Sequence, residues 1–241
     1  MMQALTRSAP RASCRLLWQP PRRLSSLASV LPRLYAPLRN PVNLLIGVNV
    51  SVWAVYALLA GEHPSVRAWY WRNMVLRESN VRRGAFFALL GSTFTHLLPL
   101  HLLVNMMALH SFGGTALAML GPRAMLGLYA ASGLAGSLAQ VNYPRIVRAL
   151  DAPARYSLHT DAPAVGASGA IAGLVAYTCL RVRYGHVYIL IVAVPNRVFL
   201  PLFAAGSGYC AWMYGDSSLG HASHLGGLIV GILLALVRKG R

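Results

Sequence analysis

A serine flanked by small residues lies at the start of a long apolar segment. Residues 166–170 read Gly-Ala-Ser-Gly-Ala, with Ser168 at the centre. A hydroxyl group near the beginning of a membrane helix is costly unless it has a partner or a function. One interpretation is structural, because Gly169 and Gly173 also form a GxxxG pattern that packs helices closely. The other is nucleophilic, because three further polar side chains can be placed beside Ser168.

These three side chains lie in two other apolar segments. His101 and Asn105 fall in the first two turns after Pro99, and His224 lies about five residues into the last apolar segment. If consecutive spans alternate in direction, the second, fourth and sixth begin on the same side of the membrane. At about 1.5 Å rise per residue, all four polar side chains then lie within roughly 10 Å of that side. They are expected to meet, because lipid offers polar groups no partner.

The residue types indicate acyl transfer. A serine hydroxyl becomes a nucleophile when a neutral imidazole accepts its proton. Ser168 would attack a peptide carbonyl, and His224 would act first as base and then as acid. Asp161 and Asp216 lie just outside the expected helices. We therefore predict a Ser–His dyad without an acidic third member.

The developing oxyanion needs hydrogen-bond donors that are already in place. The free N–H groups at the start of the fourth span supply some, and the side chains of His101 and Asn105 supply others. Removal of one such donor costs about 100- to 1000-fold in turnover, and a comparable loss is expected for Asn105→Ala. A structural clamp between helices would explain the glycines equally well, but it explains the second histidine and the asparagine less well.

A zinc site is the alternative that the 8 histidines raise. The sequence has no HExxH motif, no carboxylate among the helical candidates and no cysteine pair. We therefore expect neither a metal nor a cofactor. His221 is expected at the surface or beside the site, and His96 is expected to support the loop before the second span.

A membrane protein must position these side chains. Apolar residues make up 56% of the chain and charged residues 11%, with a mean hydropathy of +0.51. A soluble domain carries about twice that share of charge. The sequence predicts an all-α bundle of six membrane-spanning helices. They cover residues 42–59, 99–120, 124–141, 166–181, 198–214 and 219–237.

The composition of three connections between the spans predicts their structure. Residues 61–97 mix arginines with aromatic residues, which is typical of a segment lying along the membrane surface, with short helices. Residues 142–163 are polar and basic with three prolines and are predicted to form a loop. Residues 187–197 are predicted to be a loop whose apolar part lies at the interface, because one long span would bury Arg197.

The basic leader and the net charge bear on location. The net charge is +17, from 22 Lys and Arg against 5 Asp and Glu. Residues 1–40 are rich in arginine, contain serine and lack acidic residues, which is typical of a mitochondrial transit peptide. A chloroplast peptide or a disordered basic tail stays open. If the leader is cleaved, residues 20–29 are the expected zone. The membrane domain would then cover residues 41–241.

Other classes of function fit poorly. The basic residues come without a nucleic-acid-binding motif, so no nucleic acid is expected as a partner. The three cysteines form neither a disulfide framework nor a CxxC motif. A solute transporter would show inverted repeats, and the sequence shows none. Lys and Arg divide almost evenly between the two faces, so charge alone leaves the orientation open.

Three motifs in the expected order resemble the rhomboid intramembrane serine proteases. They are Gly-Ala-Ser-Gly-Ala at 166–170, His101-x-x-x-Asn105, and His224 followed by Gly227 and Gly231. Residues 92–96 and 220–227 are similar to the mitochondrial, presenilin-associated branch of that family. Ser223 stands where alanine is usual, and Ala172 lacks the aromatic ring that stacks on the histidine in bacterial members. We therefore expect His224 to be held less firmly.

The resemblance implies a function and a location. It assigns Ser168 as nucleophile, His224 as base, and His101 with Asn105 as the oxyanion-stabilising pair. It implies cleavage of transmembrane-anchored protein substrates in the lipid bilayer, without metal or cofactor. It also implies a multi-pass protein of the mitochondrial inner membrane, with the site opening toward the intermembrane space. The alternative is a catalytically inactive rhomboid-like scaffold in protein import or quality control.

Overall fold

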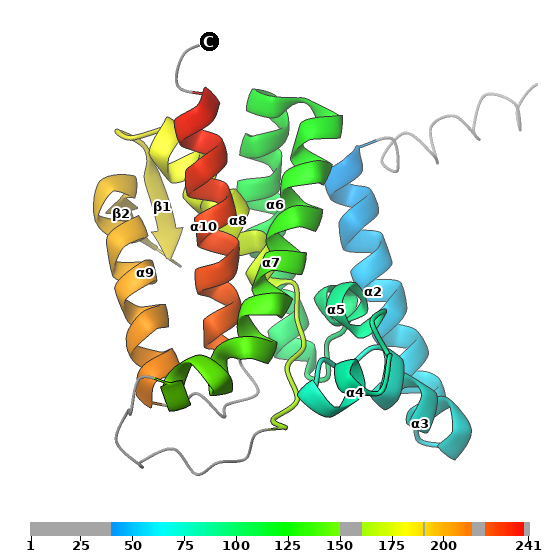
Figure 1. The fold of residues 1–241 in the computed structure, drawn as a ribbon. Helices are drawn as coiled ribbons and strands as arrows, with labels where there is room; N and C mark the ends of the chain where they lie inside the picture. Colours follow the sequence, from blue (N-terminus) through cyan, green and yellow to red (C-terminus); the bar gives the residue numbers. More distant parts are fainter. Residues whose placement is uncertain (1–39, 150–160, 190, 214–219, 239–241) are drawn as a thin grey trace, which may run out of the picture. The chain divides into compact units, whose positions relative to one another are not determined.

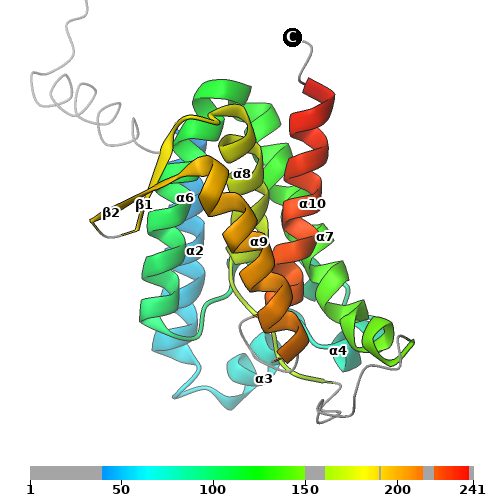
Figure 2. The same cartoon turned by 90° about the vertical axis from the view of Figure 1, so that its left-hand side faces the viewer.

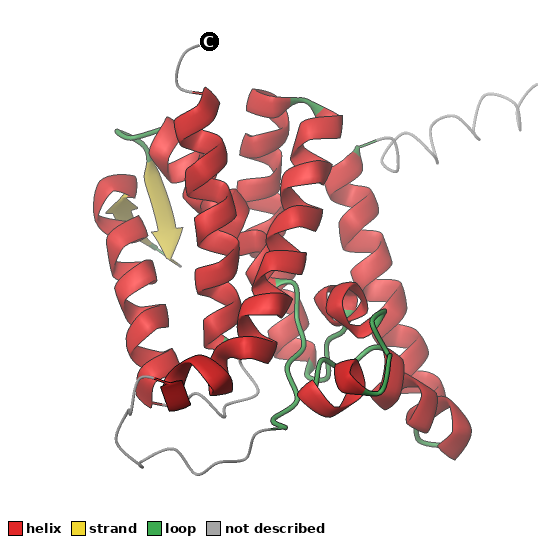
Figure 3. Ribbon diagram, in the orientation of Figure 1, coloured by secondary structure: helices red, strands yellow, loops and turns green. Residues whose placement is uncertain are grey.

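The computed structural model describes residues 40–149, 161–189, 191–213 and 220–238. Residues 1–39 of the expected leader, which include its cleavage zone, lie outside these ranges. Long helices dominate the described residues, and two short strands accompany them (Figure 3). Figures 1 and 2 show the long helices standing side by side in a bundle. They are α2 (Pro41–Leu59), α6 (Pro99–Leu120), α7 (Pro122–Ala149), α8 (Ser168–Arg181), α9 (Asn196–Met213) and α10 (His221–Val237).

Local sequence explains where several helices begin. Helices α2, α6 and α7 each start at a proline, whose fixed φ suits the first turn and whose missing N–H is not needed there. The side chain of Asn40 caps α2 by accepting the Val42 N–H at 2.9 Å. Gly121 has a φ of 74° between α6 and α7 and so permits the tight turn between them.

Helix α8 is the buried centre of the bundle. Every residue from 169 to 179 is buried, and the helix packs against α6, α7, α9 and α10. A helix that is apolar on all sides is typical of such a central position. It has only 14 residues and is therefore about 20 Å long, against about 30 Å for the hydrocarbon core of a bilayer.

The expected helical membrane bundle is confirmed. Three described helices are long and apolar enough to cross a membrane: Pro41–Leu59, Pro99–Leu120 and Pro122–Val147. Helix α10 is apolar but shorter, with 17 residues. The count of six membrane crossings stays a prediction.

The expected loop at residues 142–163 is wrong for its first part, because α7 continues to Ala149. Pro144 lies inside the helix, where its ring removes one backbone hydrogen bond and bends the helix without necessarily ending it. Figure 1 shows α7 turning aside in its last turns. Val147 is buried and Arg145 forms an ion pair with Glu78, so these turns are held by tertiary contacts.

The expected loop after α8 is also wrong, because it contains an antiparallel hairpin. Strand β1 (His186–Ile189) pairs with β2 (Val192–Pro195), and His186 lies opposite Pro195. Tyrosine, isoleucine and valine residues favour strands, which explains the pairing. The short helices expected in residues 61–97 are confirmed as α3 (Pro64–Asn73), α4 (Glu78–Arg82), α5 (Ala88–Gly91) and the 3-10 helix η2 (Ser92–Phe94).

Candidate active site

Ser168 is the first residue of α8, and the turn before it is tightly defined. Gly166 has a φ of 120°, a conformation that side chains rarely adopt. A Cβ atom at Gly166 would also lie 2.7 Å from Cε1 of His101. Glycine is therefore needed here for both its conformation and its size. The Ser168 side chain is half-buried, so it remains accessible.

The loop before Ser168 is held by main-chain hydrogen bonds to the segment after α3. The Leu76 N–H donates to the Ala164 carbonyl at 3.1 Å, and the Ala164 N–H donates back at 2.9 Å. The Gly166 N–H donates to the Ser92 carbonyl at 2.9 Å. These bonds fix the backbone two residues before the hydroxyl group.

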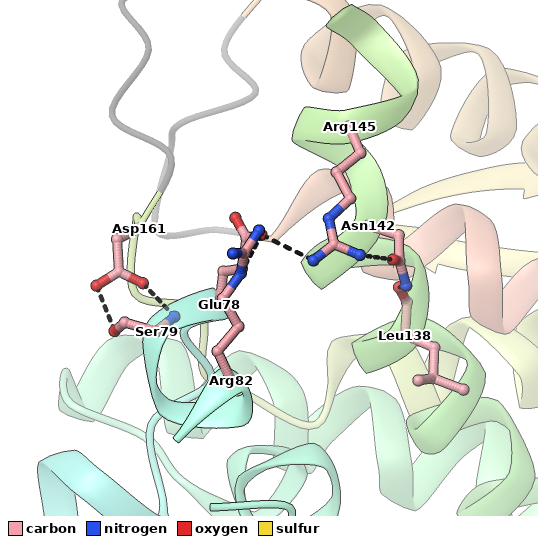
Figure 4. A network of polar contacts seen from close by, with 7 residues as sticks. All are labelled: Glu78, Ser79, Arg82, Leu138, Asn142, Arg145 and Asp161. Atoms are coloured by element: carbon pink, nitrogen blue, oxygen red, sulfur yellow. Dashed lines mark hydrogen bonds and ion pairs between the residues drawn. The ribbon is translucent and has the colours of Figure 1, made fainter. Parts of the chain in front are cut away.

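Side chains reinforce this attachment (Figure 4). The Asp161 carboxylate accepts the Ser79 N–H at 2.8 Å and the Ser79 hydroxyl at 2.6 Å. Glu78 forms ion pairs with Arg82 at 2.7 Å and with Arg145 of α7 at 3.2 Å. Asp161 thus contacts α4. Asp216, the other acid near an expected helix start, lies outside the described residues.

His224 of α10 reaches Ser168 directly. Its Nε2 lies 2.9 Å from the Ser168 hydroxyl oxygen, a normal hydrogen-bond distance. The predicted contact between these two side chains is therefore present. His224 is half-buried, like Ser168.

Glycines bring the two helices together. A methyl group added at Gly227 would overlap the carbonyl oxygen of Gly169, and one added at Gly231 would overlap that of Gly173. The two GxxxG patterns therefore face each other main chain to main chain, as small-residue packing predicts. We call this contact the glycine seam. It carries the hydroxyl group on one side and the imidazole on the other.

Two residues of α9 hold the opposite side of the imidazole. Nδ1 of His224 lies 3.3 Å from the hydroxyl oxygen of Ser207, which is buried. The ring of Phe203 lies 5.5 Å from the His224 ring, with 31° between the planes. Phe203 therefore supplies the aromatic contact that Ala172 cannot. The sequence reasoning missed both, although Ser207 is a hydroxyl residue between two glycines within a predicted span.

The two residues of the expected oxyanion pair, His101 and Asn105, both lie on α6 but make different contacts. The His101 ring lies against Gly166 and occupies the space that a Cβ atom on that residue would need. Asn105 is buried, and its amide donates to the His101 carbonyl at 2.9 Å within the helix. The structure thus brings His101 against the turn before Ser168. The Asn105 amide instead forms a hydrogen bond to the main-chain carbonyl of His101.

His96 contacts the same turn and was not expected there. It is fully buried, its ring lies 5.2 Å from that of His101, and the Ala167 N–H approaches its Nε2 at 3.4 Å. Burial, and then the neighbouring His101, lower the pKa of His96 to about 4. The ring is therefore neutral near pH 7, as an acceptor of an N–H must be.

This arrangement suits acyl transfer. If Nε2 of His224 accepts the Ser168 proton, then Nδ1 carries hydrogen and donates to Ser207. The first N–H groups of α8 have no partner within the helix and lie beside the hydroxyl group. His221 lies edge-on to His224, with 5.9 Å between ring centres.

Comparison with known proteins agrees with the motifs. Residues 83–241 match the sequence model of the rhomboid domain. Rhomboid protein 1, mitochondrial, of Saccharomyces cerevisiae is 32% identical over 200 residues, which are 81% of this chain and 52% of that protein. RHOMBOID-like protein 12, mitochondrial, of Arabidopsis thaliana is 28% identical over 173 residues, 70% of the chain and 52% of that protein.

A human protein is also similar. Presenilin-associated rhomboid-like protein, mitochondrial, of Homo sapiens is 32% identical over 151 residues, which are 58% of this chain and 35% of that protein. The chain therefore spans about half the length, or less, of these relatives.

Proposed function

The chain belongs to the rhomboid family, and from this we propose that it is an intramembrane serine endopeptidase that cleaves transmembrane-anchored proteins. The observation that carries the proposal is the 2.9 Å contact between the Ser168 hydroxyl and Nε2 of His224. The two groups come from separate helices that meet at the glycine seam. A seam that served packing alone would not need a hydroxyl–imidazole pair at its accessible end.

In the proposed reaction, the Ser168 oxygen attacks the carbonyl carbon of the scissile peptide while its proton passes to His224. The tetrahedral intermediate collapses when His224 gives that proton to the leaving amine, and an ester to Ser168 remains. A water molecule then attacks the ester, with His224 again accepting the proton. His224 returns this proton to the Ser168 oxygen as the ester bond breaks, the carboxylic acid product leaves, and both the serine and the neutral imidazole are restored.

The length of α8 supports a site below the membrane surface. Because α8 is about 10 Å shorter than a bilayer core, its first residue can lie beneath the surface when its other end reaches the opposite side. Water and an unwound substrate segment would meet there. For location we propose the mitochondrial inner membrane, supported by the mitochondrial names of the yeast, plant and human relatives and by the basic leader sequence.

A fluorophosphonate probe tests the proposal, because it reacts with activated serines. The full chain in detergent should be labelled, and Ser168→Ala and His224→Ala should each abolish labelling. Ser223→Ala is the matched control, since Ser223 adjoins His224 in sequence and its replacement should preserve labelling. A folded chain that is neither labelled nor able to cleave a transmembrane peptide would favour the inactive scaffold instead.

Ser207→Ala should lower kcat by about five- to tenfold and leave KM unchanged, because one hydrogen bond contributes about 1 kcal/mol. Ser207 is a positioning residue in this proposal: it would orient His224 through Nδ1. Ser207→Thr keeps the hydroxyl group and should restore most of the rate. Ser132→Ala is the control, since Ser132 is equally buried but lies on α7. Equal rates for the alanine and threonine variants would contradict an orienting role.

Asn105→Ala should lower kcat by about 100-fold, the lower end for an oxyanion donor. One hydrogen of the amide donates to the His101 carbonyl, which leaves the second hydrogen to donate to the oxyanion. Steady-state cleavage of a transmembrane peptide measures the effect, with Asn105→Asp as a second variant of similar shape that has no amide donor. An unchanged kcat in Asn105→Ala would remove this residue from the oxyanion site.

A further inference from the structure

A cavity lined by both charged and apolar residues lies at the other end of the same helices. It has a volume of about 410 Å³ and lies where α8 ends, α9 begins and α10 ends. Three of its lining residues are arginines: Arg181, Arg183 and Arg197. Ser168 begins α8 and Arg181 ends it, so the cavity lies about 20 Å from the proposed active site. The proposed proteolysis uses none of these arginines.

The cavity lacks a negative charge of its own. The chain has 5 acidic residues, and none of them falls within α8, the hairpin, α9 or α10. Among the described residues, the ion pairs join Glu78 to Arg82 and Arg145, and neither of these arginines lines the cavity. Three guanidinium groups around one cavity repel each other unless an anion lies between them.

The walls of the cavity combine this charge with apolar surface. Leu200, Ala235 and Leu236 line it. The apolar surface continues outward, since Leu202 of α9 is 64% exposed and Val237 of α10 is 81% exposed. A free phosphate ion would gain nothing from these side chains, whereas the acyl chains of a lipid would cover them.

Asn196 adds a polar group suited to a headgroup. It is buried in the cavity wall, and its amide donates to the Val182 carbonyl at 2.6 Å. Within the described residues, its Oδ1 is buried without a hydrogen-bond partner. A buried acceptor without a partner is costly, and a headgroup hydroxyl would satisfy it.

We propose that this cavity binds the phosphate of an anionic phospholipid, with the three arginines as ligands and the acyl chains along α9 and α10. A guanidinium group binds phosphate through two parallel N–H···O hydrogen bonds. Basic pockets between membrane helices bind anionic lipid headgroups. The site is separate from the proposed dyad, so binding does not depend on proteolysis.

Native mass spectrometry of the full chain tests the site. The chain is reconstituted with phosphatidylcholine alone or with added phosphatidylglycerol, and the retained lipid is identified. Wild type should retain phosphatidylglycerol preferentially. Replacing all three arginines with glutamine should reduce this preference by about 10- to 100-fold. The double variant Arg183→Gln with Arg197→Gln changes only exposed residues and should lose part of the preference.

A matched control removes the same charge elsewhere. Arg67, Arg72 and Arg83 are exposed arginines of the segment between α2 and α6. Replacing these three with glutamine should leave the preference unchanged. An equal loss in both triple variants would reduce the effect to overall charge and overturn the site. Competition by millimolar inorganic phosphate would overturn the lipid assignment, and so would the absence of any preference in wild type.

Discussion

Replacing Ser168 or His224 with alanine is expected to lower kcat for peptide hydrolysis by about 10⁴- to 10⁶-fold, and replacing both should cost no more than replacing one. The two groups act as a unit, because the hydroxyl is a weak nucleophile without the imidazole and the imidazole has nothing to activate without the hydroxyl. Their 2.9 Å contact is the structural basis for this expectation.

Initial rates with a transmembrane peptide in liposomes measure the effect, in both single variants and the double variant. Ser223→Ala serves as the control for local disturbance of α10. Losses that multiply in the double variant would mean that the two residues act independently. The proposed dyad would then be wrong even if each single variant were impaired.

Gly227→Val is expected to lower kcat by at least about 10³-fold, since a displacement of 1 Å already costs about 100-fold. The new side chain would overlap the Gly169 carbonyl, and both atoms of that clash belong to or adjoin the main chain. No change of rotamer relieves it, so α10 must move away from α8. That movement carries His224 away from Ser168.

The same substitution should lower stability by about 1–3 kcal/mol, the usual cost of overpacking. Thermal unfolding in detergent and cleavage rate should be measured together. Gly127→Ala on α7 is the control, since a Cβ atom there meets nothing within 4 Å. If Gly227→Val retained full activity, the glycine seam would not set the distance between the two groups.

The sequence was sufficient for the contact between Ser168 and His224. Both are polar groups at similar depth in apolar helices, and the glycines beside them allow close approach. A polar side chain within a membrane helix must find a partner at the same depth in the bilayer, and the alternating direction of the helices limits which residues lie at that depth. The bounds of α2 and α6 followed from prolines and from the lengths of the apolar runs.

Other parts of the site depend on contacts that sequence spacing does not encode. The pairing of Leu76 with Ala164 joins residues far apart in the chain, and nothing in either segment specifies the other. Ser207 was missed because its helix runs in the opposite direction to α8 and α10 in the predicted topology. The prediction compared only polar residues near the starts of the second, fourth and sixth spans, and Ser207 lies in the fifth. His96 was assigned to the preceding loop, although it also contacts Ala167.

The continuation of α7 and the β-hairpin were missed for a different reason. Pro144 predicts a helix end from local geometry, but Glu78 and the bundle hold the helix beyond it. In the hairpin, the residues of both strands favour extended structure, but each strand is short and is stabilised by pairing with the other. The prediction considered the segment as an interfacial loop and did not include this pairing.

The short central helix has a consequence for hydration of the proposed membrane domain. With 14 residues in α8 against 22 in α6, the middle of the bundle is thinner than its rim. If the missing length of α8 is divided between its two ends, each leaflet holds a vestibule of its own: one over Ser168 that admits water for the proposed hydrolysis, and one at Arg181 that is lined by arginines. Inserting one helical turn into α8 would therefore dry one of these vestibules, and which of them is lost would depend on the end that receives the insertion.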